Sequence, residues 1–387
     1  MSNIFDIDKE YVANTYNRFP LNLVEGKGSI IYDNNGKKYI DLGSGIGVTA
    51  FGIQDDEWKE AVIAQLNKIQ HASNLYYTTP CAELAKLLCE KTGFKKVFFG
   101  NSGAEANECA IKVARKYAED KGIKDSKIIT LKNSFHGRTL ATLAATGQDV
   151  FHQDFLPIVD GFLYGEANNI QSIYDLVNNN TVSAIMMECV QGEGGVIALN
   201  KDFVKQVYYL CQEKDILLII DEVQTGNGRS GKLYAYMNYD IMPDVVTTAK
   251  GLAGGLPMGA CLIGQKAQST LGAGKHGSTF GGNPIAAAGA ISIISRIDDN
   301  LLKEVQEKSK FIVDKLTGAE GVVSVSGLGL MLGIETKKPV KDVLAYCMDH
   351  GVLALTAKTK LRLLPALNIK MDDLKAAIDV ILDAVKE

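Results

Sequence analysis

Residues 216–221 read ILLIID, an uninterrupted apolar run that ends in a single carboxylate, Asp221. A run of this length without polar alternation is typical of a strand that is buried on both faces of a parallel sheet. A second short run, residues 245–248 (VVTT), precedes Lys250 and a glycine-rich loop. Ligands of open α/β sheets bind outside the carboxyl ends of the strands, so both side chains are expected to enter one crevice.

The pair of Asp221 and Lys250 has two explanations. An aspartate at a strand end often caps a loop, and a lysine before glycines is usually a solvated surface residue. An acid beside a reactive amine also suits pyridoxal phosphate, because the lysine can form a Schiff base and the carboxylate can hold the pyridinium proton. The residues at the other strand ends have to decide between the two.

The composition is that of a globular chain with no basic character. Its 387 residues are too many for one small core and indicate two or three packed units. Apolar residues make up 46% and charged residues 22%, which is typical of soluble proteins. With a net charge of −4, the chain lacks the overall basic character that is typical of nucleic-acid-binding proteins.

The cysteines and the first residues predict a reduced, cytoplasmic protein. Seven cysteines, an odd number without a C-x-x-C pair, argue against a disulfide framework or a zinc site. The five histidines also lack metal-ligand spacing. Residues 1–19 have no apolar signal region, and no apolar stretch approaches the ~18 residues that a membrane span needs. We therefore expect no metal, no membrane contact and no nucleic-acid partner.

The centre of the chain alternates short apolar strands with amphipathic helices, as βαβ units do. Five strands are expected, and each delivers a polar or glycine-rich loop to the same edge of the sheet. They lie near residues 97–99, 128–131, 182–187, 216–220 and 245–248.

The two ends of the chain differ from this centre. Residues 24–50 resemble a hairpin, and a last strand is expected near residues 361–364. The predicted fold class is therefore α/β, with a mostly parallel sheet in a large domain. Both termini are expected to form a smaller α+β domain, so the predicted division is 1–50 and 291–387 for the small domain and 51–290 for the large one.

Two of the loops offer candidate groups for a phosphorylated ring. Ser102, Gly103 and Ala104 stand where a strand leads into a helix, so free N–H groups and the helix dipole favour a phosphate, although an ordinary serine N-cap is the alternative. Phe135 can stack on a ring and Arg138 can bind a carboxylate through two hydrogen bonds. Such residues are also common in cores and on surfaces.

A third loop, residues 188–195 (ECVQGEGG), places Glu188 and Glu193 among three glycines. Glycines allow the backbone to approach a ligand closely, and the carboxylates can bind an amine or shield an arginine. The alternative is a solvated, flexible loop.

Residues 39–47 (YIDLGSGIG) carry the D-x-G-x-G-x-G pattern of nucleotide-type methyltransferases. That pattern requires a helix directly afterwards and an acid-tipped strand about 20 residues further on. The chain has neither feature, so these glycines are expected to line a turn that approaches a substrate.

Taken together, the loops resemble the fold-type I pyridoxal phosphate enzymes that include the acetylornithine, ornithine and 4-aminobutyrate aminotransferases, the class-III group. The resemblance runs from about Tyr16 to the C-terminus and includes six motifs in the family's order. They are residues 101–108 (NSGAEANE), 135–139 (FHGRT), 191–195 (QGEGG), 221–226 (DEVQTG), 249–251 (AKG) and 277–284 (GSTFGGNP).

The resemblance implies a role for each cofactor residue. Lys250 would bind pyridoxal 5'-phosphate covalently and move protons, and Asp221 would pair with the ring nitrogen. Phe135 and Val223 would enclose the ring, and Gln224 would lie near its phenolic oxygen. The remaining cofactor-binding residues are implied to be Ser102, Gly103 and Ala104 at the phosphate, His136, Glu188, and Thr279 from the other subunit of a homodimer.

The resemblance also implies how two substrates share one pocket. Arg138 would bind the substrate carboxylate. Glu193 would mask Arg362 when an ω-amino donor is bound, and Arg362 would be freed to bind the α-carboxylate of 2-oxoglutarate or glutamate.

The sequence departs from the family's pattern at a few positions that carry no catalytic group. Residues 53–56 (IQDD) replace an H-x-H-P segment, and Cys189 replaces a common proline. Ser326 stands where an arginine often precedes Gly-x-Gly, and Ala366 stands in place of a second proline. These differences loosen the inference about the amino donor.

The expected activity is a ping-pong aminotransferase in arginine biosynthesis. It would move the terminal amine of N-acetylornithine to 2-oxoglutarate, giving N-acetylglutamate semialdehyde and glutamate. Ornithine, succinylornithine and 4-aminobutyrate are alternative donors. A pyridoxal phosphate aminomutase or decarboxylase and a cofactor-free binding protein are more remote alternatives.

Overall fold

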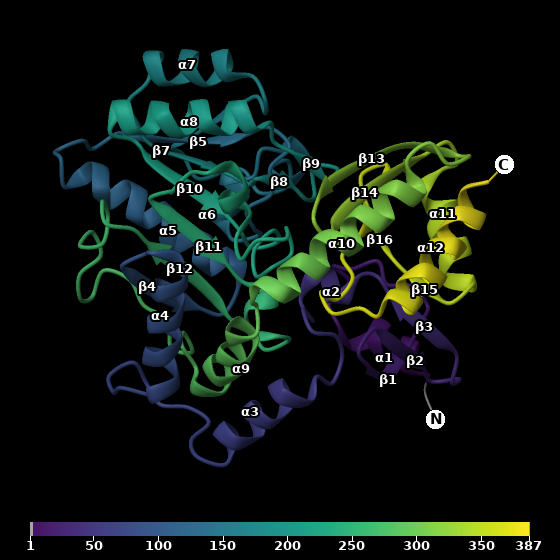
Figure 1. Cartoon of the computed structure of the whole chain (residues 1–387). Coiled ribbons are helices and arrows are strands. Elements are labelled where there is room, and N and C mark those ends of the chain that lie inside the picture. Colours follow the sequence, from purple (N-terminus) through teal and green to yellow (C-terminus); the bar gives the residue numbers. More distant parts are fainter. Residues whose placement is uncertain (1–2, 387) are drawn as a thin grey trace.

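The computed structural model describes residues 3–386, and its largest element is a seven-stranded sheet (Figure 1). Six strands are parallel to one another, and only β12 runs against its neighbours. The prediction of a mostly parallel central sheet is therefore confirmed. In spatial order the strands are β4 (Lys96–Gly100), β12 (Gly259–Ile263), β11 (Val245–Thr248), β10 (Leu217–Asp221), β7 (Val182–Met187), β5 (Lys127–Leu131) and β6 (Phe162–Gly165).

Successive residues of these strands enter two different apolar cores. In β10, Leu217 and Ile219 pack with α5 (Gly103–Glu119), while Leu218 and Ile220 belong to the core on the opposite face. That opposite face is covered by α7 (Ile170–Asn179) and α8 (Lys201–Lys214), as Figure 1 shows. Every residue of β10 is buried, which explains the unbroken apolar run at residues 216–220.

The expected hairpin near the N-terminus is present, and the far end of the chain completes its sheet. Strands β1 (Leu23–Lys27), β2 (Ile30–Asp33) and β3 (Lys38–Asp41) are antiparallel, and β15 (Val352–Leu353) pairs in parallel with β3. The two ends of the sequence thus share one sheet. The domain limits near residues 50 and 290 stay predictions.

A second small sheet is wholly C-terminal. Its order is β13 (Val322–Leu328), β14 (Met331–Thr336), β17 (Lys360–Leu363) and β16 (Leu355–Ala357). Strand β17 is the strand expected near residues 361–364, and it carries Arg362. The neighbouring helices are α10 (Asp299–Leu316), α11 (Val340–Asp349) and α12 (Met371–Val385).

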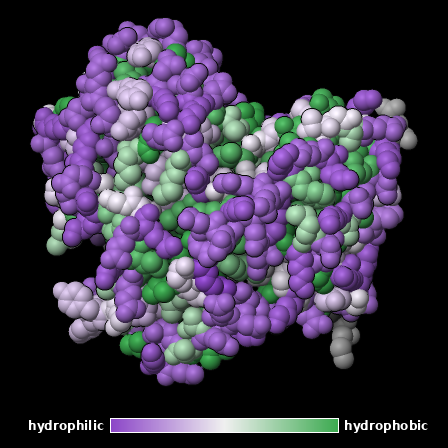
Figure 2. Space-filling model, in the orientation of Figure 1, coloured by the Kyte–Doolittle hydropathy of each residue, from purple (hydrophilic) through white to green (hydrophobic). Residues whose placement is uncertain are grey.

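The remaining elements connect these sheets. On the face drawn in Figure 2 the surface is mostly hydrophilic, with hydrophobic side chains in the recess between the two parts. None of the helices within residues 3–386 is long and apolar enough to cross a membrane.

The elements that connect the sheets are α1 (Ile4–Tyr11), α3 (Asp56–Leu66), α4 (Thr79–Thr92), α6 (Leu140–Ala145), η1 (Asp149–Phe151), β8 (Val190–Gln191), β9 (Ile197–Ala198), η2 (Ala235–Tyr239), η3 (Lys250–Ala253) and α9 (Pro284–Ser295).

The rejected methyltransferase pattern falls on a distorted single turn, α2 (Ser44–Gly47). Gly45 and Ile46 inside it have φ values of 60° and 67°. A regular helix N-terminus cannot form there, because both residues have left-handed backbone conformations.

Gly259 of β12 is a position where the sheet tolerates no side chain. A Cβ atom there would lie 2.0 Å from the carbonyl oxygen of Ser102, which is a backbone atom and cannot rotate away. We expect Gly259→Ala to lower the free energy of unfolding by about 1–3 kcal/mol, the usual cost of overpacking. Thermal unfolding would measure this, with Gly272→Ala as the control, since nothing lies within 4 Å of a Cβ at Gly272. Equal melting temperatures for the two variants would contradict the prediction.

Candidate active site

The carboxyl ends of the parallel strands open into one cavity of about 590 Å³. The strand ends of β4, β5, β7, β10 and β11 all contribute to its lining, as the sequence predicts. Eleven of the predicted site residues line it: Ser102, Gly103, Ala104, Phe135, His136, Arg138, Glu188, Asp221, Val223, Gln224 and Lys250. Tyr16 and Val48 from the N-terminal part of the chain also line the cavity, although their sequence surroundings predict no role for them.

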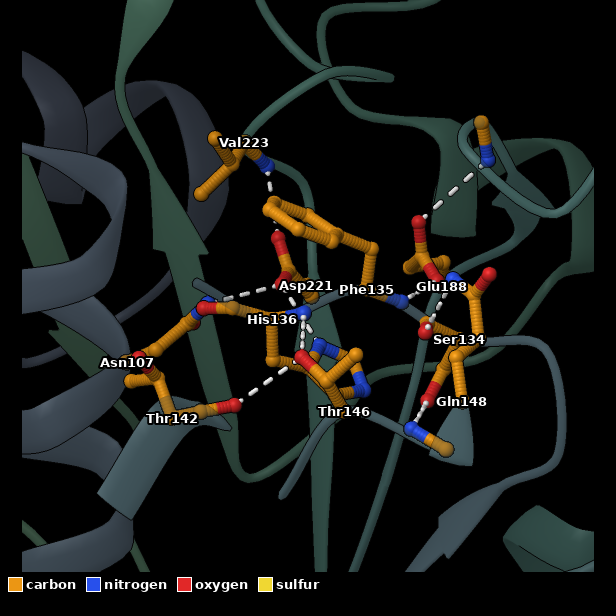
Figure 3. A network of polar contacts seen from close by, with 12 residues as sticks. Asn107, Ser134, Phe135, His136, Thr142, Thr146, Gln148, Glu188, Asp221 and Val223 are labelled. Atoms are coloured by element: carbon orange, nitrogen blue, oxygen red, sulfur yellow. Dashed lines mark hydrogen bonds and ion pairs between the residues drawn. The ribbon is translucent and has the colours of Figure 1, made fainter. Parts of the chain in front are cut away.

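Asp221 lies at the bottom of this cavity and is 3% exposed. Its Oδ2 accepts a hydrogen bond from Asn107 Nδ2 at 2.8 Å and contacts His136 Nδ1 at 2.8 Å, and its Oδ1 accepts one from Val223 N at 3.0 Å (Figure 3). Three donors, from α5, from the loop after β5 and from the residues just after β10, fix the direction of the carboxyl group. One lone pair of Oδ1 is left for a further donor.

His136 acts as a partner of Asp221. The ring is fully buried, and burial alone would lower its pKa, but the hydrogen bond and the charge of Asp221 raise the pKa above its ordinary value. Because a carboxylate only accepts, the proton of this contact lies on Nδ1 of His136. The ring therefore braces the carboxylate from the side away from Val223 (Figure 3).

Asn107 is a site residue that the sequence analysis quoted within a motif without assigning a role. Its amide nitrogen donates to Asp221 Oδ2 and also, at 2.7 Å, to the carbonyl oxygen of His136. The two N–H donors of the Asn107 amide thus fix Asp221 and the backbone of His136 together. In the sequence, the signal for Asn107 was a polar residue on an apolar helix face, between Ala106 and Ala110. In the structure this residue is 1% exposed.

Lys250 lines the same cavity as Asp221 and has a strained backbone conformation. Its φ is +46°, which is rare for a residue with a side chain and is typical of functional sites. Burial lowers the pKa of the amine to about 8, although the nearby carboxylate of Glu193 opposes this shift. At this pKa most of the amine is still protonated at pH 7, but the neutral, nucleophilic share is far larger than for an ordinary lysine.

Glu193 and Arg362 form an ion pair at the edge of the site. Arg362 Nη1 lies 2.5 Å from Glu193 Oε1 and also donates to Gln224 Oε1 at 3.1 Å. Arg362 is 4% exposed and Glu193 is 32% exposed, so the acid is on the accessible side of the pair. Burial would raise the pKa of Glu193, but the charge of Arg362 and its hydrogen bond hold that pKa below its ordinary value.

Glu188 links the loop after β7 to the loop after β5. Its carboxylate accepts hydrogen bonds from the backbone N–H groups of Phe135 at 3.0 Å and Gly192 at 3.3 Å. Burial raises the pKa of Glu188 to about 7. The residue positions the ring of Phe135 and the start of the loop that carries Glu193.

Ser102 stands at the N-terminus of α5, where the sequence indicates either a helix N-cap or a phosphate site. Its hydroxyl accepts from Glu105 N at 3.2 Å, so Ser102 is an N-cap. The N–H groups of the first helical turn, at Gly103 and Ala104, have no acceptor within the helix and face the cavity lining. Gly103 is required here, because a Cβ would lie 2.6 Å from Val223 Cγ1.

Arg138 is exposed at the cavity entrance. Its guanidinium lies 4.3 Å from the centre of the Phe151 ring and 5.5 Å from that of Phe135. Within residues 3–386 no carboxylate forms an ion pair with Arg138. The charge is therefore available for an anionic ligand.

Thr279 is the one predicted cofactor residue that this subunit does not bring to the cavity. It is exposed, in a loop held by hydrogen bonds from Asn74 to the carbonyl oxygens of Ser278 and Gly281. Its predicted contribution is to the other subunit, so its role stays a prediction.

The residues of the cavity fit pyridoxal 5'-phosphate. Asp221 keeps an acceptor position for a pyridinium N–H, the start of α5 offers free N–H groups for a phosphate, and Lys250 offers an amine of lowered pKa. Phe135 and Val223 both line the cavity, and both lie near Asp221 in Figure 3, so they are placed to contact a ring whose nitrogen pairs with Asp221. When bound, this cofactor supplies an aldehyde for amines and an electron-accepting ring.

Comparison with known proteins points to the same chemistry. Residues 11–385 match the family described as aminotransferase class-III. The chain is 50% identical to the acetylornithine aminotransferase of Haemophilus ducreyi, covering 99% of this chain and 98% of that protein. It is 44% identical to the acetylornithine aminotransferase of Aquifex aeolicus, covering 96% and 98%.

Solved structures agree. The ornithine aminotransferase of Toxoplasma gondii, in a crystal structure with partial occupancy of pyridoxal phosphate, superposes with a TM-score of 0.94 at 28% identity, covering 99% of this chain and 93% of that one. The N-acetylornithine aminotransferase of Stenotrophomonas maltophilia gives a TM-score of 0.85 at 33% identity, covering 98% of each chain.

The two hydrogen bonds donated by Asn107 give the first prediction for this site. We expect Asn107→Leu, which keeps the volume and removes both donors, to weaken cofactor binding about tenfold, because a buried carboxylate loses a partner. Titrating the apoprotein with pyridoxal phosphate would measure the change. Glu119→Gln on the exposed last turn of α5 is the control, and equal affinities in the two variants would refute the role of Asn107.

The lowered pKa of Lys250 gives a pH dependence. Only the neutral amine attacks an aldehyde, so the rate of covalent attachment of cofactor to the apoprotein should rise with pH through about 8. Removing the carboxylate with Glu193→Gln should shift this midpoint to lower pH, because that charge favours the protonated amine. Borohydride reduction and mass measurement of the Lys250 peptide would follow the reaction. A midpoint near 10.5 in the unsubstituted protein would contradict the prediction.

Proposed function

The chain belongs to the class-III aminotransferase family, which makes it a pyridoxal phosphate-dependent aminotransferase, and from this we propose that its amino donor is N-acetylornithine. The terminal amine of the donor is transferred to 2-oxoglutarate, and the products are N-acetylglutamate semialdehyde and glutamate. The acetylornithine aminotransferases that are 50% and 44% identical over nearly the whole chain support this donor.

The observation that carries the proposal is the ion pair of Glu193 and Arg362 beside Lys250. A donor that presents a terminal amine has no carboxylate near the reacting carbon, and a free buried cation there would be costly. Glu193 neutralises Arg362 while such a donor is bound. With 2-oxoglutarate or glutamate, Glu193 moves away on its exposed side and the substrate's α-carboxylate replaces it.

The other residues of the cavity divide the work of binding. Ser102, Gly103 and Ala104 bind the cofactor phosphate, and Asp221, braced by Asn107 and His136, keeps the ring nitrogen protonated.

Side chains of the cavity would enclose the cofactor ring, and one residue would act as the base at the reacting carbon. Phe135, Val223 and Gln224 line the cavity; the first two would cover the two faces of the ring, and Gln224 would lie near its phenolic oxygen. Among the residues that the structure describes, Lys250 is the only amine in the lining of the cavity, and it transfers the proton at the reacting carbon. Arg138 binds the carboxylate at the far end of the donor.

We propose that the protein is a homodimer whose partner subunit supplies Thr279 to the phosphate. The loop that carries Thr279 is exposed, and Phe280 beside it is 58% exposed. Leu75, Tyr76 and Tyr77 are 86%, 73% and 103% exposed. Apolar side chains of this size on one surface suit burial against a second copy. A cytoplasmic location and a place in arginine biosynthesis follow from the proposed reaction.

Ornithine is the second candidate donor, because the ornithine aminotransferase of Toxoplasma gondii superposes with a TM-score of 0.94. Succinylornithine and 4-aminobutyrate share the terminal amine and remain further alternatives. An aminomutase or decarboxylase needs no second dicarboxylate substrate, so the Glu193–Arg362 pair argues against both.

A panel of four donors with 2-oxoglutarate tests the proposal. We expect N-acetylornithine to give glutamate with a kcat/KM about a hundredfold above that of 4-aminobutyrate, which corresponds to roughly 2.7 kcal/mol of transition-state binding. Glutamate formation from N-acetylornithine, ornithine, succinylornithine and 4-aminobutyrate would be followed with the holoenzyme. A higher kcat/KM for any other donor would replace N-acetylornithine, and no glutamate from all four would refute the proposal.

A further inference from the structure

Ser326 connects the small sheet to the loop that carries Glu193. Its hydroxyl donates a hydrogen bond to the carbonyl oxygen of Val196 at 2.8 Å and accepts one from Lys360 Nζ at 2.8 Å. An ammonium group can only donate, so Lys360 forces the single proton of the serine toward Val196. This position departs from the family's pattern, which often has an arginine.

Ser326 and Arg362 lie in one row across the small sheet. Ser326 of β13 pairs with Gly333 of β14, and Gly333 pairs with Arg362 of β17. Directly paired residues point to the same face of a sheet, and strands are about 4.8 Å apart, so Ser326 and Arg362 face one side roughly 10 Å from each other. Strand β9, directly after Val196, lies beside β13 in Figure 1.

Val196 sits on this row between the two side chains. A Cβ at Gly333 would lie 2.8 Å from Val196 Cβ, so the absent side chain makes room for the valine. Val196 is fully buried and has a φ of +53°, an unusual conformation for a β-branched residue. Such an outlier persists only where its surroundings hold it, which here are Ser326 and the surface of Gly333.

The segment from Gly192 to Val196 is a closed turn. The N–H groups of Gly195 and Val196 donate to the carbonyl oxygen of Gly192 at 3.4 and 3.3 Å. Glu193 lies inside this turn, so the turn contacts the sheet at two points. The contact at Val196 has no charged partner that a substrate could displace, whereas Glu193 can be displaced from Arg362 by a substrate carboxylate.

We propose that Ser326, oriented by Lys360, is a positioning residue that sets how strongly Glu193 competes with dicarboxylate substrates for Arg362. While Val196 is anchored, Glu193 stays close to Arg362 even when their ion pair opens, and its effective concentration there is high. Without the anchor the acid samples more of the solvent and Arg362 is free more often. The inference rests on the proposed alternation of Glu193 at Arg362.

The test compares Ser326→Ala with Ser324→Ala. Ser324 lies two residues away on the same strand, and its hydroxyl contacts Glu335 at 2.9 Å, so that variant leaves the turn untouched. Glutarate is the probe, because it has two carboxylates and no group that can react. Its dissociation constant on the holoenzyme would be measured by titration calorimetry, alongside the kcat/KM of N-acetylornithine.

Ser326→Ala should bind glutarate about fivefold more tightly and use N-acetylornithine about fivefold less efficiently, as expected for the loss of one hydrogen bond. Gly333→Ala, which pushes Val196 off the sheet without touching the hydroxyl, should change both quantities in the same directions. Ser324→Ala should match the unsubstituted enzyme.

Unchanged glutarate affinity in Ser326→Ala, or weaker binding of glutarate and donor together, would overturn the proposal. The donor assignment fails separately. If the unsubstituted enzyme uses another amine in place of N-acetylornithine, the glutarate titration still decides whether Ser326 acts on Arg362.

Discussion

In a sheet that is buried on both faces, polar side chains can lie only at the strand ends. Alternate residues of β10 enter two apolar cores, so neither face of the strand can carry a charge without a large desolvation cost. Charged and hydrogen-bonding side chains are therefore confined to the residues just beyond the strand ends. Because the strands are parallel, these residues converge, and Asp221, Glu188 and Lys250 meet in one cavity. The chemistry of the site is a consequence of the way the core is filled.

The same constraint explains why the site is so heavily braced. A carboxyl group that is 3% exposed needs hydrogen-bond partners within the protein, and Asp221 has three: Asn107 of α5, His136 in the loop after β5, and the backbone N–H of Val223. Each donor is itself fixed: Asn107 by a carbonyl oxygen, and His136 by burial and by a hydrogen bond from its backbone N–H to Thr146 Oγ1. The carboxylate is thus pre-oriented before any cofactor arrives.

The parts of the fold that the sequence predicts are those set by local pattern. Five of the six parallel strands, the hairpin at residues 30–41 and strand β17 follow from apolar runs and turn residues, whereas the parallel edge strand β6 was not predicted. Strand β12 was not predicted, because a short segment that begins with glycine has no pattern of its own and is defined by pairing with β4 and β11. Asn107 and Ser326 were missed as functional groups for a similar reason, since their partners lie 114 and 130 residues away. Such contacts exist only once the tertiary structure has formed.

The position of β17 near the end of the chain has a consequence for biosynthesis. Glu193 and Arg362 are 169 residues apart, and the sheet that presents Arg362 lies near the end of the chain. A nascent chain can complete its central sheet while the ribosome is still translating the rest, but it exposes that sheet's ligand cavity without Arg362. Arg362, the second carboxylate receptor, is therefore added to the site only after all the residues that line the cavity have been synthesised.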